Sequence, residues 1–486
     1  MLLIVGFGIL LALLFRLWWT LCDGWALFDH SIPSPPEADV LFGHGRVVNP
    51  MYGEASVRWF QSWAARFPRL IKFRVFYFFS IATAHPDTVR AVLKDRGRKS
   101  FAYRLVRHWT GDGLLVSEGA KWHMRRKLLT PSFHFEILKS YTNIFNEATD
   151  VFVEQIRKAG GEPVDVYSKC LFLTLDTITR CLLGYDTHCQ TQHNEYVKIV
   201  NRLTTLTIER CYEPLKYYLW TYRCTAEGRE YMALRKRFKE LGREIIEKRL
   251  KKLEEDKGCV TANFLDNLLS LEYEDGSSFS VEEVQEELNI VLFAGHDTTA
   301  SALAWTLHLL SLHPEHVLQC REEVVRVLGE GRGDLLFMSQ QEAGRMEYLS
   351  MCIKESLRLR PPVPYLGRNP ANDIIVGKHR IPAGSNVTIM VDALHRLGEV
   401  WEAPEEFRPE RFSKENSINR NHFSYIPFGA ESRNCIGKNF ALTEMKMALA
   451  KVLYNFNFET VDPDSVTRLA AITQKPENLL MTFSKI

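Results

Sequence analysis

The residue with the clearest capacity for chemistry is Cys435, in the segment Phe428-Gly-Ala-Glu-Ser-Arg433-Asn-Cys435-Ile-Gly437. A helical pattern follows directly, so backbone amides at the junction of loop and helix can stabilise a thiolate. Arg433 can meet a carboxylate, and Gly437 leaves room for a flat ring system. A free cysteine is more often a small buried hydrophobe. This combination instead favours an axial cysteine ligand to haem iron, which donates electron density and promotes O–O cleavage.

A second polar group, Ala294-Gly-His-Asp-Thr-Thr299, lies in the middle of a long helical pattern. Glycine and threonine disfavour helix interiors, and a hydroxyl that bonds back to a carbonyl opens a local groove. An acid beside an alcohol, Asp297 and Thr298, can relay protons during oxygen activation. The alternative is a kinked helix with incidental polar residues. His296 fits a polar helix position better than a second iron ligand, because two strong ligands would leave no site for oxygen.

Both segments resemble motifs of the cytochrome P450 haem-thiolate monooxygenases. The family's cysteine loop is Phe-x-x-Gly-x-Arg-x-Cys-x-Gly, and this chain departs from it at Glu431, where the family has glycine. The family's helix motif, Ala/Gly-Gly-x-Asp/Glu-Thr-Thr, is matched throughout. The resemblance implies that Cys435 binds the iron of a haem b and that Asp297 and Thr298 are the acid–alcohol pair. Glu431 would be strained if the turn requires a positive φ, and it places a negative charge near the thiolate. The other haem-contacting positions of the predicted loop are Phe428, Arg433 and Gly437.

The segment Glu355-x-x-Arg358 places opposite charges three residues apart on a predicted helix. Such a pair is a surface ion pair by default, worth a few tenths of a kcal/mol. The family resemblance, together with the downstream Arg411, implies instead a buried network that holds the cysteine loop in place. Removing one partner of a buried network costs about 3–5 kcal/mol. We assign these three residues to structure and haem retention.

Trp122 and Arg126 are four residues apart, so they share one face of a predicted helix. An ordinary surface pair is the alternative. By resemblance to the family's Trp-x-x-x-Arg helix, both are expected to bind a haem propionate. Arg368 and Arg433 resemble further propionate-binding arginines, and His395 is a weaker candidate.

Three stretches resemble the clan of the family that contains the fatty-acid ω-hydroxylases of animals. They are residues 113–119, residues 121–135 and residues 295–299. Many members of that clan carry a glutamate before the helix glycine that esterifies to haem. Ala294 occupies this position, so the haem is expected to be bound non-covalently, and one support for terminal-carbon selectivity is lost.

The elements that position these residues are mostly helices. A capping box, Ser280-x-x-Glu283, predicts a helix that runs to about Leu312 and is close to 50 Å long. A charged stretch, residues 229–257, predicts a solvated helix. Strand-like segments are limited to residues 69–82 and to residues 373–391, which read as two strands. The fold class is therefore mainly α with minor β, the cytochrome P450 fold of a helical haem domain with small sheets.

Bulk composition excludes several classes of protein. The chain has 486 residues and a net charge of +2, which argues against a general nucleic-acid binder. Its ten cysteines are scattered without a Cys-x-x-Cys pair, so neither a zinc module nor a disulfide framework is supported.

The N-terminal residues are apolar up to Phe15 and are followed by Arg16 and two tryptophans. They predict a membrane anchor over residues 1–22, with a cleaved signal peptide as the alternative. A proline-rich hinge follows over residues 23–45, and residues 46–486 form the haem domain. The expected location is the endoplasmic reticulum membrane, with the catalytic domain facing the cytosol.

The leading hypothesis is a monooxygenase that inserts one oxygen atom into a C–H bond of an apolar substrate, such as a fatty acid or related lipid. Electrons are expected from an NADPH-dependent flavoprotein reductase, with cytochrome b5 as a second candidate, because the chain has no flavin or dinucleotide motif of its own. A basic face of Arg125, Lys127 and Lys438 is the expected docking surface. The alternatives are a haem-thiolate isomerase that rearranges peroxides, against which Asp297 and Thr298 argue, and a degenerate haem binder, for which only Glu431 argues.

Overall fold

The computed structural model describes residues 8, 13–14, 18, 31–38, 43–45, 53–75, 78–95, 97–184, 188–191, 195–255, 263–271, 273, 278–329, 336–470 and 472–486. Contacts divide the chain into two units, which are described separately. The first contains residues 1–103, 365–404 and 421–426, and the second contains residues 104–364, 405–420 and 427–486. Nearly all of the predicted anchor, residues 1–22, lies outside the described residues. Among the helices that are described, none has the length and apolarity needed to cross a membrane.

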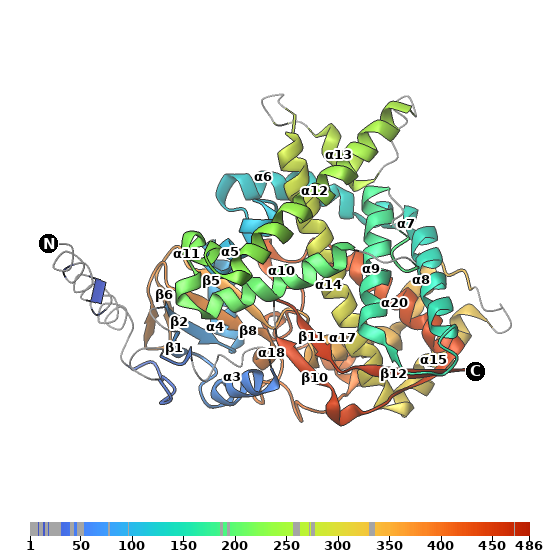
Figure 1. The fold of residues 1–486 in the computed structure, drawn as a ribbon. Helices are drawn as coiled ribbons and strands as arrows, with labels where there is room; N and C mark the ends of the chain where they lie inside the picture. Colours follow the sequence, from blue (N-terminus) through green and yellow to red (C-terminus); the bar gives the residue numbers. More distant parts are fainter. Residues whose placement is uncertain are drawn as a thin grey trace. The chain divides into compact units, whose positions relative to one another are not determined.

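A five-stranded sheet, ordered β1–β2–β8–β5–β3, organises the first unit (Figure 1). Only β2 and β8 pair in parallel among its neighbours; the other pairs are antiparallel. The strands are β1 (Ile71–Val75), β2 (Phe78–Thr83), β3 (Arg98–Lys99), β5 (Tyr365–Asn369) and β8 (Val387–Met390), and the helices are α3 (Glu54–Arg66), α4 (Pro86–Lys94) and α18 (Val391–Leu394). The strand pair predicted over residues 69–82 is confirmed as β1 and β2.

The prediction of two strands over residues 373–391 was incomplete. Strands β6 (Ile374–Val376) and β7 (His379–Ile381) form the expected hairpin, and Gly377 turns the chain between them with a φ of +59°. A third strand, β8, follows the hairpin in the chain but belongs to the five-stranded sheet. Its register there pairs it with β2 on one side and β5 on the other, and such long-range pairing has no local signal in the sequence.

Part of the predicted proline-rich hinge packs within the first unit. The Pro33 carbonyl accepts a hydrogen bond from the Lys72 amide at 2.8 Å, and Ile32 is buried. The Pro35 carbonyl lies 2.9 Å from Nε2 of His44. These contacts fix the described part of the segment beside β1.

The second unit is mainly helical and is built around α14, the long yellow-green helix of Figure 1. Helices α9, α12, α17 and α20 all contact α14. Two small sheets complete the unit: β4 (Val164–Asp165), β12 (Leu480–Lys485) and β9 (Phe456–Thr460) in one, and β10 (Thr467–Ala470) with β11 (Gln474–Glu477) in the other. The helices are α5 (Ala102–Thr110, which begins at the boundary of the units), α6 (Gly119–Leu129), α7 (Phe135–Ser140), α8 (Thr142–Arg157), α9 (Val166–Leu183), α10 (Glu195–Tyr212), α11 (Leu219–Arg223), α12 (Ala226–Glu255), α13 (Phe264–Ser270), α14 (Val281–Ser311), α15 (Pro314–Leu328), α16 (Gln340–Arg345), α17 (Glu347–Leu359), α19 (Lys414–Ser417) and α20 (Lys438–Asn455).

The start and end of α14 follow the sequence signals. Ser280 and Glu283 form the predicted capping box, in which each side chain accepts from the other residue's backbone amide. The helix ends at Ser311, and Pro314 begins α15. Gly295 allows α9 to approach closely, because a β-carbon at this position would lie 2.0 Å from Cδ1 of Ile178. The helix is therefore continuous through its glycine and threonine residues, and it is held by packing.

Candidate haem site

The cysteine loop is a tight turn that precedes α20. The Cys435 amide donates to the Phe428 carbonyl at 2.8 Å, which closes the loop. Gly429 has a φ of +67° and Glu431 has a φ of +58°. The family's glycine position thus requires a left-handed backbone, and the predicted strain at Glu431 is present, at a cost of about 1–2 kcal/mol for a residue with a β-carbon. The carboxylate of Glu431 is exposed to solvent.

The Cys435 side chain is accessible, yet protein atoms surround it closely enough that burial raises the pKa of its thiol. The Gly437 amide and the charges of Arg126 and Lys438 act in the opposite direction on this pKa and stabilise the thiolate. A β-carbon at Gly437 would meet nothing closer than Phe133, at 3.9 Å. The sulfur therefore has open space beside it and cations near it, which suits a flat anionic cofactor.

Helix α6 brings the predicted propionate-binding residues to the cysteine loop. The guanidinium carbon of Arg433 lies 3.8 Å from the centroid of the Trp122 ring, and its Nη1 donates to the Ser117 carbonyl at 2.9 Å. Arg126 donates to the carbonyl of Asn434 at 2.9 Å and to its side-chain oxygen at 2.8 Å. Trp122, Arg126 and Arg433 thus gather at the loop, and their propionate-binding role stays a prediction.

Arg368 and His395 lie in the first unit. Arg368 is a buried residue of β5, and its Nη1 donates to the Gly367 carbonyl at 2.9 Å. Nε2 of His395 accepts from the Ile426 amide at 2.9 Å. The propionate-binding role of both residues stays a prediction.

The pair Glu355–Arg358 is fully buried, although its spacing alone suggests a surface pair. Arg358 donates through Nε to Oε2 of Glu355 at 2.7 Å and through Nη2 to Oε1 at 2.8 Å. Glu355 also accepts from the Arg408 amide at 2.9 Å and from Nε of Arg411 at 3.3 Å. Arg358 bonds the Glu406 carbonyl at 3.0 Å. Both side chains are 0% exposed, so the network ties α17 to the segment around residues 406–411 in a place where an unpaired charge is costly.

The acid and the alcohol of α14 have different surroundings. Oγ1 of Thr298 donates to the Ala294 carbonyl at 2.7 Å, which is the back-bond expected from the sequence. Asp297 is buried, and its carboxylate accepts from Tyr167 at 3.1 Å and from Thr473 at 2.5 Å. It also forms an ion pair with Nζ of Lys475 at 3.1 Å.

Lys475 sets the ionisation of Asp297. Burial raises the pKa of Asp297, but Lys475, His296 and Thr473 lower it further than burial raises it, so the pKa lies below its ordinary value. His296 itself is buried, with Nδ1 2.6 Å from the Leu292 carbonyl. Sequence reasoning missed Lys475, Tyr167 and Thr473. They lie more than a hundred positions from Asp297, and no local spacing connects them to it.

A single stripe of α14 is accessible in the middle of the helix. From Glu287 to Leu310 every residue is buried except Val291, Ala294, Gly295 and Thr298. These four have the spacing i, i+3, i+4 and i+7, so they form one continuous face. The face is apolar apart from the Thr298 hydroxyl, and it belongs to a helix that packs against α20.

The predicted basic docking face needs one correction. Arg125 is 0% exposed and pairs with Glu287 at 2.7 Å, Glu283 at 3.1 Å and Glu286 at 3.4 Å, so it cannot contact a partner protein. The α6 helix turns this arginine toward the N-terminal part of α14. Lys127 and Lys438 are exposed, as expected.

Comparisons with known proteins agree with this site. The family model "Cytochrome P450" matches residues 33–483. Cytochrome P450 4F2 of Homo sapiens is 34% identical over 479 residues, which cover 94% of this chain and 90% of the relative. Leukotriene-B4 omega-hydroxylase 3 of Mus musculus is 34% identical over 448 residues, covering 88% and 84%. The crystal structure of the cytochrome P450DA heme domain superposes with a TM-score of 0.83 at 27% identity, covering 94% of this chain and 98% of that one.

These relatives confirm the resemblance to the animal ω-hydroxylase clan and the mainly helical fold with small sheets. The family implies a haem held by a cysteine thiolate, and the accessible Cys435, the space beside Gly437 and the nearby cations fit that group. The chain belongs to the cytochrome P450 family and is a cytochrome P450 monooxygenase.

Proposed function

We propose that this monooxygenase oxidises C–H bonds of medium- or long-chain fatty acids or related lipids. The observation that carries the proposal is the accessible stripe of α14, because three of its four residues offer only apolar or backbone surface to a substrate. The name of the murine relative, a leukotriene-B4 omega-hydroxylase, supports an apolar chain with a carboxylate.

Cys435 is proposed as the axial ligand of a haem b, which supplies oxygen activation when it is bound. Trp122, Arg126 and Arg433 would hold its propionates, with Arg368 as a further candidate, and Phe428 and Gly437 would border the ring. Ala294 has no carboxylate that could form an ester, so the haem is proposed to be non-covalent. Acidified organic solvent should therefore extract unmodified haem b completely from the denatured protein, and haem that stays with the polypeptide would contradict this assignment.

Thr298 and Asp297 are proposed to transfer protons to the site where oxygen is activated. The Thr298 hydroxyl lies on the accessible stripe and can hand a proton to a molecule there, whereas the Asp297 carboxylate lies behind it on the buried side. Lys475 keeps Asp297 ionised, so this carboxylate can accept a proton and return it. The arrangement supports a relay in which Thr298 is the terminal donor.

The substrate proposal is tested by spectral titration of the purified holoenzyme. The reduced protein under carbon monoxide should show the strongly red-shifted Soret band of a thiolate-ligated haem, and Cys435→Ala should abolish it. Fatty acids of increasing chain length should then shift the Soret band of the oxidised enzyme with saturable affinity, whereas matched short-chain acids should not. Product analysis after turnover gives the position of hydroxylation. A normal carbon monoxide band with no response to any fatty acid would refute the substrate and leave the enzyme class intact.

An NADPH-dependent flavoprotein reductase is the proposed electron donor, with cytochrome b5 as a second candidate. Burial lowers the pKa of Lys354, and the nearby positive charges of Lys438 and Arg420 lower it further. This local excess of positive charge supports docking of an acidic partner. Lys438→Glu should raise the reductase concentration needed for half-maximal turnover, most strongly at low salt. The control Lys251→Glu changes a lysine that is 78% exposed on another helix, and an equal effect of both variants would contradict a docking patch.

The endoplasmic reticulum membrane is the proposed location, with residues 1–22 as the anchor and the catalytic domain facing the cytosol. A second feature supports contact with a membrane: Leu215, Tyr218 and Trp220 are 81%, 59% and 72% exposed within a short segment. Exposed aromatic residues of this kind favour the membrane interface. A chain without residues 1–22 should retain binding to phosphatidylcholine vesicles, and Trp220→Ser in that chain should weaken it. Equal vesicle binding with and without Trp220 would exclude this segment.

A further inference from the structure

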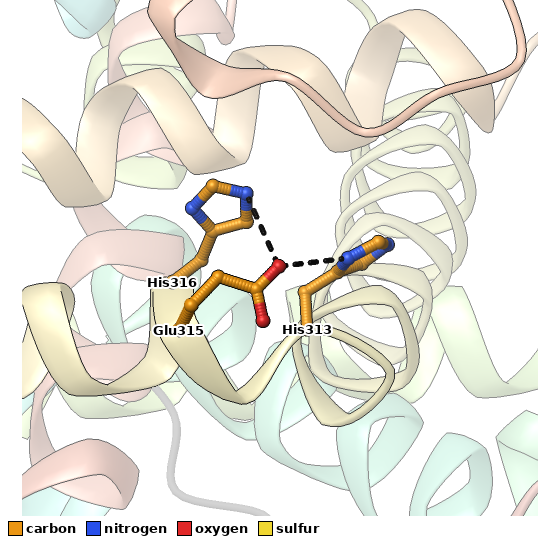
Figure 2. Close-up of side chains that lie close together, drawn as sticks. All are labelled: His313, Glu315 and His316. Carbon is orange, nitrogen blue, oxygen red and sulfur yellow. Dashed lines mark hydrogen bonds and ion pairs between the residues drawn. The ribbon is translucent and has the colours of Figure 1, made fainter.

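The start of α15 brings together three side chains that have the chemistry of metal ligands. Figure 2 shows the Glu315 carboxylate between the imidazoles of His313 and His316. Its Oε1 lies 3.4 Å from Nδ1 of His313 and 3.9 Å from Nε2 of His316. The three ligand atoms all lie within 4.8 Å of one another. In a tetrahedral zinc site with bonds of about 2.0–2.1 Å, neighbouring ligand atoms are about 3.4 Å apart, so small side-chain movements suffice to close this set around an ion.

A second observation fixes the form of His316. Nδ1 of His316 lies 2.7 Å from the Tyr348 hydroxyl, and that hydroxyl donates to Oε1 of Glu410 at 3.0 Å. Tyr348 has one hydroxyl proton, which this bond uses, so the tyrosine oxygen accepts from Nδ1–H of His316. Neutral His316 therefore carries its lone pair on Nε2, and this nitrogen faces the Glu315 carboxylate at a distance too long for a hydrogen bond.

The pattern is that of a built coordination shell. Ligating histidines usually donate their second nitrogen to a carboxylate, a carbonyl or a water, which orients the ring and raises its basicity. Here Tyr348 supplies that support from α17, and Glu410 supplies it from the short turn Pro409–Phe412. His316 is 9% exposed and is held against Phe407, whose ring also stacks on His313 with centroids 5.1 Å apart. Both imidazoles are thus oriented by packing before any ion binds.

The ordinary alternative is a carboxylate paired with protonated histidines at a helix N-terminus. The positive end of α15 favours the Glu315 carboxylate and disfavours a cation, by about 0.3–1 kcal/mol. That penalty is small beside the free energy of coordination by two imidazoles and a carboxylate. The hydrogen bond to Tyr348 also selects the tautomer with its lone pair on Nε2, the nitrogen that faces Glu315, and an ion pair does not require this selection.

We propose that His313, Glu315 and His316 form a binding site for a divalent first-row transition-metal ion such as Zn²⁺. Nδ1 of His313, Oε1 of Glu315 and Nε2 of His316 are the ligands, and water fills the fourth position. This set of nitrogen and carboxylate ligands suits zinc and excludes calcium, which prefers oxygen ligands alone. The site is separate from Cys435 and does not depend on the substrate of the enzyme.

The test uses the tag-free holoenzyme, treated with a chelator and then dialysed against Zn²⁺ at graded concentrations. One Zn²⁺ per chain should bind with an affinity well above that of the remaining surface, and X-ray absorption at the zinc edge should show two imidazoles and oxygen ligands. Glu315→Gln should weaken binding at least tenfold, and the double variant His313→Gln/His316→Gln should remove it. The carbon monoxide spectrum of each variant reports whether the fold is intact.

Tyr348→Phe distinguishes a built site from chance chelation by surface histidines. It keeps all three ligands and removes only the support of His316, so it should weaken Zn²⁺ binding about 10- to 100-fold. His422→Gln, which changes an exposed histidine in the first unit, should have no effect. Wild-type protein without stoichiometric binding, binding retained by the double variant, or unchanged affinity in Tyr348→Phe would each overturn the proposal.

Discussion

Replacing Glu431 by glycine should stabilise the holoenzyme. Glu431 adopts a φ of +58°, whereas the neighbouring Ser432 is not in the left-handed region. A residue with a β-carbon pays about 1–2 kcal/mol for this backbone conformation. Glycine removes that cost, but it also makes the unfolded protein more flexible, which lowers the free energy of unfolding by about 0.4–1 kcal/mol. The expected net gain is about 0.5–1 kcal/mol, which corresponds to a two- to fivefold change in the unfolding equilibrium.

Urea unfolding at neutral pH, followed by both the Soret band and tryptophan fluorescence, measures this difference. Two matched variants separate the possible causes. Glu431→Ala removes the charge and keeps the β-carbon, so its stability should equal that of the wild type within about 0.5 kcal/mol. Ser432→Gly adds flexibility where no strain exists, so it should destabilise by about 0.5–1 kcal/mol.

A neutral or destabilising Glu431→Gly would refute the reasoning from backbone strain. If Glu431→Ala stabilises as much as Glu431→Gly, the charge near the thiolate is the cause. A large gain in haem occupancy for Glu431→Gly, beyond what the stability change explains, would instead identify Glu431 as a defect in haem binding.

Three further predictions follow from buried polar groups and from the proposed relay. Glu355→Gln should destabilise the protein by about 3–5 kcal/mol and speed haem loss, because Arg358 stays buried beside a neutral amide. Urea midpoints measure the loss of stability, with the exposed residue Glu347, changed to Gln, as the control. Equal effects of the two variants would contradict the prediction. The lowered pKa of Asp297 means that its pairing with Lys475 contributes stability above the ordinary aspartate pKa, and this contribution is lost as the pH falls through the lowered value. Lys475→Met removes the largest cause that lowers the pKa of Asp297, so the stability gained above the ordinary aspartate pKa should shrink, while Lys475→Arg should behave as the wild type. A parallel pH profile for the Met variant and the wild type would refute the assignment. Thr298→Ala should lower product formation by about a hundredfold at continued NADPH consumption, whereas Thr298→Ser should retain coupling; an uncoupled Ser variant would show that the hydroxyl is not the donor.

The family motifs can be recognised in the sequence, whereas the residues that support them cannot. The cysteine loop and the motif on α14 are contiguous segments, so their chemistry can be read from residue order. Their supports come from elsewhere: Lys475 and Thr473 follow Asp297 by more than 170 positions. Each pairing exists only because α14 packs against the C-terminal part of the second unit.

The sequence alone determined the local features of this protein. Spacing predicted the cysteine loop before α20, a hydroxyl back-bond in the middle of α14 and the capping box at its start, because each depends on residues within one or two turns of chain. The family resemblance marked Glu431 as strained on condition that the turn has a positive φ, and the structure shows that φ. Tertiary structure decided the burial of Arg125, which sequence placed on a docking face, and the transfer of β8 into the main sheet. It also decided that Glu355 and Arg358 are buried and that Asp297 pairs with Lys475. Burial and long-range pairing depend on which faces pack together, and that information is spread over the whole chain.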